Sequence, residues 1–419
     1  MSSNPAPAWT CPFCPLACDH FSVQAAAGRL APAGADCTRA QAMLARFGTT
    51  PGAAEAEIDG TPASREAAIA AAAGVLGASR QPLFAGLGAD VAGARALYAL
   101  ACATGAISDA AGGVALMQGL RALQDRGQFT TTLAEVRARA DLIVFVGGLP
   151  DAAAPLTLER LGLGAALARR VVVLGSGTDD AAGLARWAGP AVAVETLYLQ
   201  DDLFTTLAWL GAAVAGRAPA GLPPALRALA EQLRAARYAV LVGTPARLPA
   251  QSALIIEAVH RLVGDLNRST RAAALWIGGG NGAATANQVW AWLSGLPLRS
   301  RAGPQGLEHE PHVFDTVRLI ADGAVDALLW VSSFEPDAAP PNSALPQVVL
   351  GHPDQASACR RKGSIFIPVA TPGVGAAGHV FRTDGTVLMP LFAVRPDGLP
   401  GVDEVARALL GALESRRAA

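Results

Sequence analysis

The sequence is short of charge, and above all of lysine. Charged residues make up 16% of the 419 residues, the formal net charge is -1, and Lys362 is the only lysine. A chain without an excess of positive charge has no general electrostatic attraction for a polyanion. This balance argues against nucleic acid or an anionic membrane surface as a partner.

Long hydrophobic runs are also absent from the sequence. The longest apolar stretches, such as residues 206–216, fall well short of the roughly 20 residues that a membrane span needs. The first residues, MSSNPAPAWTCPF, lack the basic start and apolar run of a secretory signal. We therefore expect a cytoplasmic protein, and in that compartment clustered cysteines favour a metal site over disulfides.

Hydrophobic residues, in contrast, make up 52% of the chain. A length of 419 residues exceeds what one hydrophobic core usually supports, so two or more domains are expected. Continuous apolar strands alternate with helical segments, a pattern typical of parallel sheets that are covered on both faces. The predicted fold class is α/β, with two doubly wound, mainly parallel-sheet domains and a small N-terminal cysteine-rich β-hairpin head.

The predicted elements follow the apolar patterns and the turn residues. Short buried strands are expected within residues 81–88, 141–150, 170–180, 238–245, 273–282, 346–353 and 364–372. Helices are expected within residues 64–79, 91–105 and 252–266, and a helix followed by a strand within 316–336. Residues 140–150 and 325–336 share one pattern, an acid, a buried strand and a loop closed by proline, which indicates two similar α/β domains.

Four cysteines near the N-terminus form the strongest motif. Cys11, Cys14, Cys18 and Cys37 follow the spacing Cys-x2-Cys-x3-Cys-x18-Cys. Four thiolates suit an iron–sulfur cube or a tetrahedral zinc ion. The tight first spacing lets three sulfurs converge from one loop, and a predicted hairpin at residues 21–32 returns the chain to the fourth. A [4Fe-4S] cluster is the favoured interpretation, with zinc or an empty remnant loop as alternatives.

Two glycine-containing turns could meet a phosphate group. Residues 278–288, GGGNGAATANQ, lead from a strand into a helix, and residues 174–180, LGSGTDD, follow another strand. Backbone N–H groups at such a turn can bind an anion. Both turns lack the lysine of a P-loop and the spacing of a dinucleotide fingerprint, so tight strand-to-helix turns are the favoured interpretation.

The other candidate ligands are weaker. His309 and His312 lie close together in HEPH, within a proline-containing loop, which is poor support for a metal site. His20 lies beside the cysteine loop and could tune a cluster or lie at the surface. Cys102 is expected to be a small buried hydrophobic residue, and Cys359 a lone thiol.

These stretches resemble a known family. A Cys-x2-Cys-x3-Cys…Cys head on paired α/β domains is similar to the large subunit of molybdopterin-dependent oxidoreductases, and within them to the B subunit of formylmethanofuran dehydrogenase. The resemblance rests on stretches that span nearly the whole chain in the family's order: CPFCPLACD, CTRAQ, and residues 120–150, 287–297, 314–336 and 367–385. In the family the second domain is inserted into the first, which implies a head at 1–50, a first domain at 51–130 and 236–419, and an inserted domain at 131–235.

One departure from the family bears on function. In the active dehydrogenase, a cysteine or selenocysteine ligates molybdenum or tungsten just before the segment that matches LRALQDRG, and a histidine follows it. Here that region, residues 108–127, contains neither residue type around Val114 and Ala115. Alkyl side chains cannot ligate a metal or transfer a proton. We therefore expect no molybdopterin centre.

The resemblance is greatest to the beta subunit of the bacterial formyltransferase/hydrolase complex. It implies a non-redox scaffold subunit without catalytic residues, in a complex that converts formyl-tetrahydromethanopterin to formate through a methanofuran-type carrier during one-carbon oxidation. The implied partners are amidohydrolase-like, formyltransferase-like and glutamate-synthase-like subunits. The B subunit of an active formylmethanofuran dehydrogenase and an unrelated cluster-binding electron-transfer subunit are the alternatives.

Overall fold

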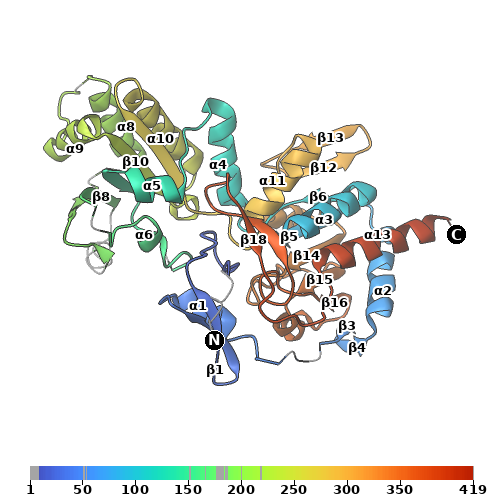
Figure 1. The fold of residues 1–419 in the computed structure, drawn as a ribbon. Coiled ribbons are helices and arrows are strands. Elements are labelled where there is room, and N and C mark those ends of the chain that lie inside the picture. The colour runs from blue at the N-terminus through green and yellow to red at the C-terminus, as the bar shows by residue number, and fades with distance from the viewer. Residues whose placement is uncertain are drawn as a thin grey trace. The chain divides into compact units, whose positions relative to one another are not determined.

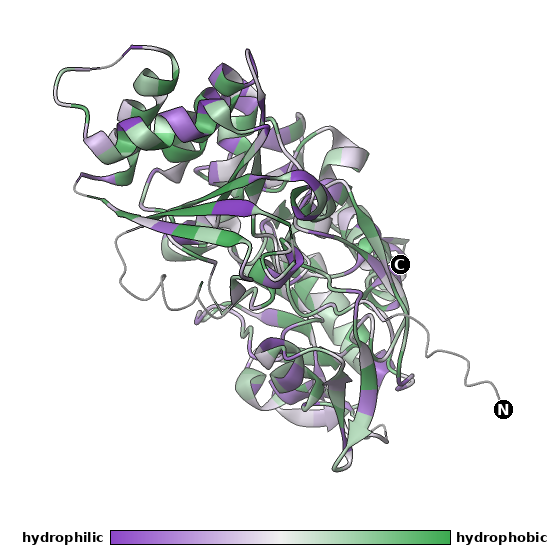
Figure 2. Ribbon diagram, turned by 60° about the vertical axis from the view of Figure 1, so that its left-hand side comes forward, coloured by the Kyte–Doolittle hydropathy of each residue, from purple (hydrophilic) through white to green (hydrophobic). Residues whose placement is uncertain are grey.

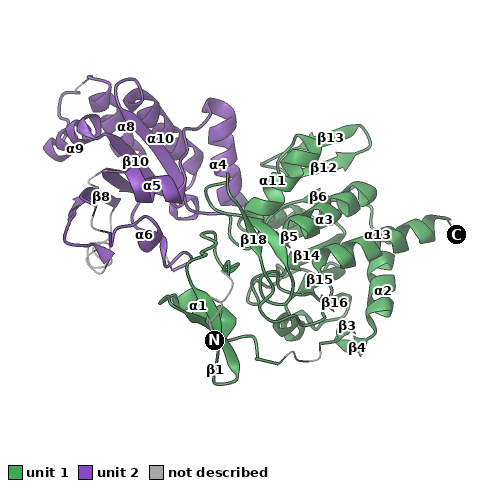
Figure 3. Cartoon of the chain, viewed as in Figure 1, with its two compact units in different colours: residues 1–113, 279–419 green, residues 114–278 purple. Residues whose placement is uncertain are grey.

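The computed structural model describes residues 9–50, 52, 54–150, 152–165, 167–175, 184, 187–199, 201–217 and 219–418. The chain divides into two compact units (Figure 3). Unit 1 contains residues 1–113 and 279–419, and unit 2 contains residues 114–278. Figure 1 shows their elements along the chain. Within the described ranges, no helix is both long and apolar enough to cross a membrane.

Unit 1 contains one large sheet, two small two-stranded sheets and the helices that pack on them. Its strands are β1 Ser22–Ala26, β2 Arg29–Ala33, β3 Ala56–Ile58, β4 Thr61–Ala63, β5 Pro82–Gly88, β6 Ile107–Ser108, β12 Ser300–Gly303, β13 Gly306–His309, β14 Ala327–Ser332, β15 Gln347–Gly351, β16 Ser364–Pro368, β17 Gly378–Phe381 and β18 Leu388–Leu391. Its helices are α1 Thr38–Leu44, α2 Arg65–Ala78, α3 Val91–Thr104, α11 Ala283–Ser294, α12 Thr316–Ala321, α13 Val402–Ala418 and the 3-10 helix η2 Pro353–Cys359.

The large sheet of unit 1 has nine strands in the order β13-β12-β6-β5-β14-β15-β16-β3-β4. The central strands β6, β5, β14, β15 and β16 are parallel, and antiparallel pairs flank them on both sides. Every residue of β5, β14, β15 and β16 is buried, which explains why these strands read as continuous apolar runs. Helix α13 packs on α3 and α2, and α11 packs on α3.

Local sequence signals position the helices that follow the sheet strands. Ser64 accepts a hydrogen bond from the Ala67 N–H and begins α2, and Asp90 accepts one from the Gly93 N–H and begins α3. Such side-chain caps satisfy N–H groups that have no partner within the helix. Helix α3 ends at Gly105, whose φ of +66° suits a residue without a Cβ atom.

Unit 2 is a smaller parallel α/β unit. Its elements are α4 Gly113–Arg126, α5 Leu133–Arg139, β7 Leu142–Val146, α6 Thr157–Arg160, β8 Arg169–Gly175, β9 Val192–Tyr198, α8 Leu203–Val214, α9 Pro224–Ala235, β10 Tyr238–Gly243, the 3-10 helix η1 Pro245–Arg247, α10 Ser252–Leu266 and β11 Arg271–Trp276. The strands form a parallel sheet in the order β11-β10-β7-β8-β9. Side chains of β7, β8 and β10 share one core with apolar residues of α8, α9 and α10.

The predicted fold class is confirmed, including the hairpin of the head. Strands β1 and β2 pair in antiparallel register around Ala27 and Gly28, and both turn residues have positive φ values, +48° and +76°. This is the backbone shape that a two-residue hairpin turn requires. Figure 2 shows hydrophobic residues, in green, along many of the strands.

The observed division of the chain differs from the expected boundaries at residues 130 and 236. Strands β10 and β11, which were expected in the first domain, pair with β7 in the sheet of unit 2. Unit 2 therefore extends over residues 114–278. Strand pairing within a parallel sheet depends on contacts between segments that are far apart in sequence. An alternating pattern of strands and helices therefore does not determine which sheet a strand joins.

Candidate functional site

The four cysteines of the sequence motif lie in the head of unit 1, and all four are buried. Cys11, Cys14, Cys18 and Cys37 are 3%, 8%, 3% and 6% exposed. The Cys11 N–H donates to the Cys18 carbonyl at 2.8 Å and closes the loop between them. Cys37 precedes α1, and its Sγ accepts the Ala40 N–H at 3.4 Å. The motif therefore forms one buried loop and one helix cap.

This cysteine loop, residues 11–18, is attached to three other loops of unit 1. The Thr383 N–H donates to the Pro15 carbonyl at 2.8 Å. A Cβ atom on Gly280 would lie 3.3 Å from the Pro15 ring, and one on Gly373 would lie 3.2 Å from the Pro12 ring. The two prolines thus pack where glycines leave room for them.

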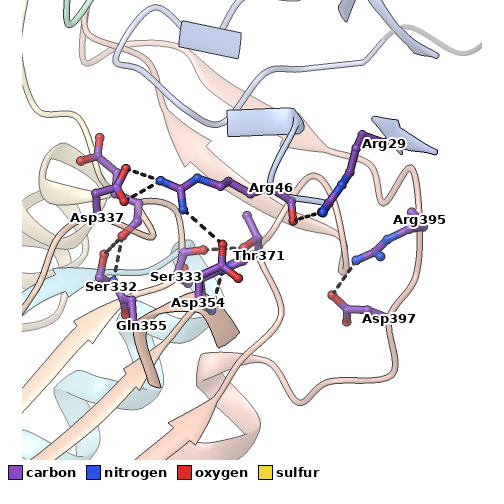
Figure 4. Close-up of polar contacts among 12 residues, drawn as sticks. Arg29, Arg46, Ser332, Ser333, Asp337, Asp354, Gln355, Thr371, Arg395 and Asp397 are labelled. Carbon is purple, nitrogen blue, oxygen red and sulfur yellow. Dashed lines mark hydrogen bonds and ion pairs between the residues drawn. The ribbon is translucent and has the colours of Figure 1, made fainter. Parts of the chain in front are cut away.

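Charged side chains add to the attachment of the head. Arg39 donates to the Phe13 carbonyl and forms an ion pair with Glu335, in the loop after β14. Burial raises the pKa of Glu335, and the Arg39 guanidinium acts against this rise. Arg46 lies between Asp337, at 2.7 Å, and Asp354, at 3.4 Å (Figure 4). This outer network is substantially exposed, so each pair contributes at most about 1 kcal/mol.

The polar side chains at the carboxyl ends of β5, β14 and β16 bond to one another or to backbone. Asn281 donates to the Ser332 hydroxyl at 3.2 Å. The Thr371 hydroxyl donates to the Ser333 carbonyl at 2.7 Å (Figure 4). The Ser333 hydroxyl donates to the Gly88 carbonyl, also at 2.7 Å. Ligands of doubly wound proteins bind at this edge of the sheet. Here these groups hold adjacent loops together.

The glycine turn at residues 278–288 serves close packing. Gly282 precedes α11 with a φ of +72°. A Cβ atom at this position would lie 2.7 Å from the Ala89 nitrogen and 2.8 Å from the Ala89 oxygen. The glycine thus lets two backbone segments approach each other. Of the other glycine turn, LGSGTDD, residues 176–180 lie outside the described part of the chain.

The cysteines fit an iron–sulfur cluster in residue type and burial, but their side chains are not gathered into a ligand arrangement. Burial raises the pKa of the Cys11 thiol, and the three other cysteines raise it further. Burial also raises the pKa of Cys14, to about 11. Thiols in this state are neutral, whereas metal ligands are thiolates. Among the described residues, no three His, Cys, Asp or Glu side chains come together in a way that could hold a metal ion.

The remaining candidates take structural positions. His309 Nδ1 lies 3.1 Å from the Arg299 carbonyl, and His20 stacks edge-on against Phe21. The expectation for Cys102 was wrong, because this thiol is exposed on α3, whereas Cys359 is buried in the core beside Phe366. An apolar helix sequence does not reveal which of its faces is turned toward the core.

Sequence reasoning missed the residues that attach the head. Arg39 and Glu335 lie in stretches that carry the family resemblance, but the sequence does not show that they pair. The partners in Arg39–Glu335 and Arg46–Asp337 are 296 and 291 positions apart. The matching pattern around residues 325–336 placed Glu335 in the loop after a buried strand. Val114 lies in the first turn of α4, where its side chain is 58% exposed.

Comparisons with known proteins agree with this architecture. No protein-family model matches the chain. The chain is 32% identical over 368 residues to the Fhc B subunit of the formyltransferase/hydrolase complex of Methylorubrum extorquens, covering 86% of this chain and 97% of that protein. The crystal structure of that organism's formyltransferase/hydrolase complex with methylofuran contains a chain that this structure matches with a TM-score of 0.75 and 29% identity, over 87% of this chain and 100% of that one.

Proposed function

The chain belongs to the family of the B subunit of the formyltransferase/hydrolase complex, and we propose that it is a non-redox scaffold subunit of such a complex. The observation that carries this proposal is the extent of the match, over 97% of the relative's length in sequence and 100% of the matched chain in structure. A match over 86% of this chain is longer than either unit alone, so both units take part in it. The proposal therefore does not rest on one shared domain.

The reaction that we propose for the complex is formyl transfer followed by hydrolysis. A formyl group passes from formyl-tetrahydromethanopterin to a methanofuran-type carrier and is released as formate. The other subunits perform these steps, namely an amidohydrolase-like, a formyltransferase-like and a glutamate-synthase-like subunit. The relative's name and the methylofuran bound to the matched complex support this assignment. We place the complex in the cytoplasm, where clustered cysteines stay reduced.

The scaffold role is supported by the residues at the position of the dehydrogenase's metal ligand. Val114 and Ala115 stand there, at the start of α4, and their alkyl side chains offer no ligand atom and no acid or base. An active molybdenum or tungsten dehydrogenase would need its metal held without a protein thiolate. The chain's contribution is then to bind and position the catalytic subunits.

We propose a structural role for the cysteine loop, in which Cys11, Cys14, Cys18 and Cys37 hold a [4Fe-4S] cluster. The spacing of the four cysteines and their burial support this proposal, as does the location of Cys11, Cys14 and Cys18 in one loop. Filling the site requires the four thiols to lose their protons and to turn toward one centre. The bound cluster would join the loop to α1 within the head.

The scaffold proposal is tested by assembling the complex with and without this chain. The chain is co-expressed with the other three subunits from the same organism and purified through a tag on itself. We expect all four subunits to co-purify and to release formate, and the chain alone to be inactive. Molybdenum or tungsten near one per chain, or failure of the subunits to co-purify, would contradict the proposal.

The cluster proposal is tested by iron and acid-labile sulfide analysis after anaerobic purification. We expect about four irons and four sulfides per chain. The matched pair of variants is Cys18→Ser, in the buried loop, and Cys102→Ser, which alters an exposed thiol on α3. Only Cys18→Ser should lose the iron. A wild-type chain without iron would identify the loop as a remnant, and zinc in its place would assign a different metal.

A further inference from the structure

The outer face of a two-stranded ribbon in unit 1 is unusual in composition. Strands β17 and β18 pair in antiparallel register. The inward side chains of Val380, Met389 and Leu391 form a core cluster with Ala17 of the cysteine loop and Phe334 after β14. Because side chains alternate between the two faces of a strand, the residues between them point outward. An antiparallel ribbon with one wet face normally carries polar residues there.

The outward positions of this ribbon are mostly apolar. Phe381 pairs with Leu388, and His379 pairs with Pro390. Leu388 is 43% exposed, and Phe392, which follows β18 directly, is 53% exposed. His379 is the only polar side chain among these positions. Both faces of the ribbon are therefore mainly apolar. The inner face is covered by the core cluster, whereas the outer face is covered only in part, by α11.

Helix α11 extends this apolar surface. The exposed ring of Trp292 packs edge-on against Phe381, with 5.2 Å between the ring centroids. The Phe381 N–H donates to the Thr285 hydroxyl at 2.9 Å and fixes the ribbon to the helix. Leu293, the next residue on α11, is 44% exposed and lines an adjacent mostly apolar groove of about 440 Å³ between α3, α11 and α13. We call Trp292, Leu293, Phe381, Leu388, Pro390 and Phe392 the ribbon patch.

Charge identifies the chemistry of the partner. None of the six residues of the ribbon patch is charged, and the ion pair Arg382–Asp384 beside the ribbon is buried, with 2.6 Å between its atoms. His379 lies on the same face, and Arg95 and Arg407 line part of the adjacent groove. A charged partner surface would lose its hydration against such a patch without gaining an ion pair. The complementary surface is uncharged and apolar, of the kind found at the centre of subunit interfaces, where aromatic residues are enriched.

We propose that the ribbon patch docks an uncharged apolar face of another subunit of the formyltransferase/hydrolase complex, an inference that rests on the proposed function. Contiguous exposed apolar surface mainly serves as an interaction site. Trp292 and Phe392 supply the large, stiff side chains that usually dominate binding energy. The inner face of the same ribbon packs on the cysteine loop, so this docking site adjoins the head.

The test uses the full chain with the three other subunits. Two variants alter different elements of the ribbon patch. One combines Leu388→Asp with Phe392→Asp, at the two ends of β18, and the other is Trp292→Asp on α11. Val317→Asp is the matched control, since Val317 is an apolar residue of unit 1 that is 72% exposed on α12, outside the ribbon patch. Binding to the other subunits is measured by co-purification and by titration, and folding by thermal melting of the isolated chain.

We expect both patch variants to bind the other subunits at least tenfold more weakly than the wild type, with unchanged melting temperatures, and the control to bind normally. Wild-type affinity in folded patch variants would overturn the docking site and leave the scaffold role intact. A wild type that binds none of the subunits would overturn the scaffold role and the docking site together. Light scattering measures whether the chain forms a homodimer. A wild-type homodimer that the patch variants convert to a 42.5 kDa monomer would assign the surface to a second copy and overturn the proposal.

Discussion

The indole Nε1 of Trp9 donates to the carbonyl oxygen of Gly373 at 2.6 Å, across 364 positions of the chain. Trp9 is only 2% exposed, and the Pro12 ring packs against the same glycine. This bond joins the beginning of the head to the loop that follows β16. A buried carbonyl that loses its donor costs free energy because no water replaces the bond.

Trp9→Phe should therefore destabilise unit 1 by about 1–3 kcal/mol. The phenyl ring keeps most of the apolar packing but leaves the Gly373 carbonyl without this donor. The measurement is the melting temperature of the purified chain, which should fall by a few degrees. Trp292→Phe is the control, because Trp292 is 54% exposed and should shift the melting temperature little. Equal melting temperatures for Trp9→Phe and wild type would show that the bond is not stabilising.

The glycines at the two ends of α11 separate two effects of adding a side chain, namely a clash with a neighbouring backbone segment and the strain of a positive φ angle. Gly282 and Gly295 flank the helix with φ values of +72° and +78°. A Cβ atom at Gly282 would lie 2.7 Å from the Ala89 nitrogen, whereas one at Gly295 would meet nothing within 4 Å. Gly295→Ala should cost about 1 kcal/mol from positive φ alone. Gly282→Ala should cost about 3 kcal/mol or more of folding stability. The melting temperatures of the two variants measure the difference, and similar losses for Gly282→Ala and Gly295→Ala would contradict the close approach at Gly282.

Protonation of His260 is expected to lower the folding stability of the chain in acid. Burial lowers the pKa of this side chain to about 4, and Trp276 donates to its Nε2 at 3.0 Å. The unfolded chain, with an ordinary histidine pKa near 6.5, therefore binds more protons between pH 6.5 and pH 4, so unfolding becomes easier as the pH falls through that range. The expected loss is on the order of 3 kcal/mol.

The histidine contribution is isolated by substitution. His260→Gln keeps an acceptor for the Trp276 indole but cannot titrate, so its stability should change less between pH 7 and pH 4.5 than that of the wild type. His312→Gln alters an exposed histidine and is the control for the loss of an imidazole ring. Denaturant unfolding at several pH values gives the comparison, and parallel curves for wild type and His260→Gln would exclude His260 as the cause.

The buried pair Asp109 and Arg299 is expected to act as a unit. The carboxylate and guanidinium meet at 3.1 Å, with side chains 2% and 5% exposed. Burial raises the pKa of Asp109, and Arg299 opposes that rise. Arg299→Met leaves the Asp109 charge without its main partner and should cost about 3–5 kcal/mol.

A double-mutant cycle measures this coupling. Asp109→Asn removes the charge, so adding it to Arg299→Met should recover part of the lost stability. Arg318→Ala, at a side chain that is 53% exposed, is the control and should change stability by less than about 0.5 kcal/mol. Additive effects of the two buried substitutions would mean that the two side chains stabilise the fold independently.

The sequence by itself determined the local elements and the fold class. The helix expected within residues 64–79 is α2, and the hairpin expected at residues 21–32 is formed by β1 and β2. Continuous apolar runs predicted the buried parallel strands, because a strand that is covered on both faces has no polar positions. The cysteine spacing located a loop that is indeed one buried segment.

Only the tertiary structure decided which distant segments meet. It placed β10 and β11 in the sheet of unit 2, buried Cys359 while exposing Cys102, and brought Arg39 to Glu335. It also turned Phe381 toward Trp292 on the outer face of the ribbon. Hydrophobic patterns show that a residue will be covered, but the pairing of strands and the facing of side chains depend on contacts between parts of the chain that are far apart in sequence.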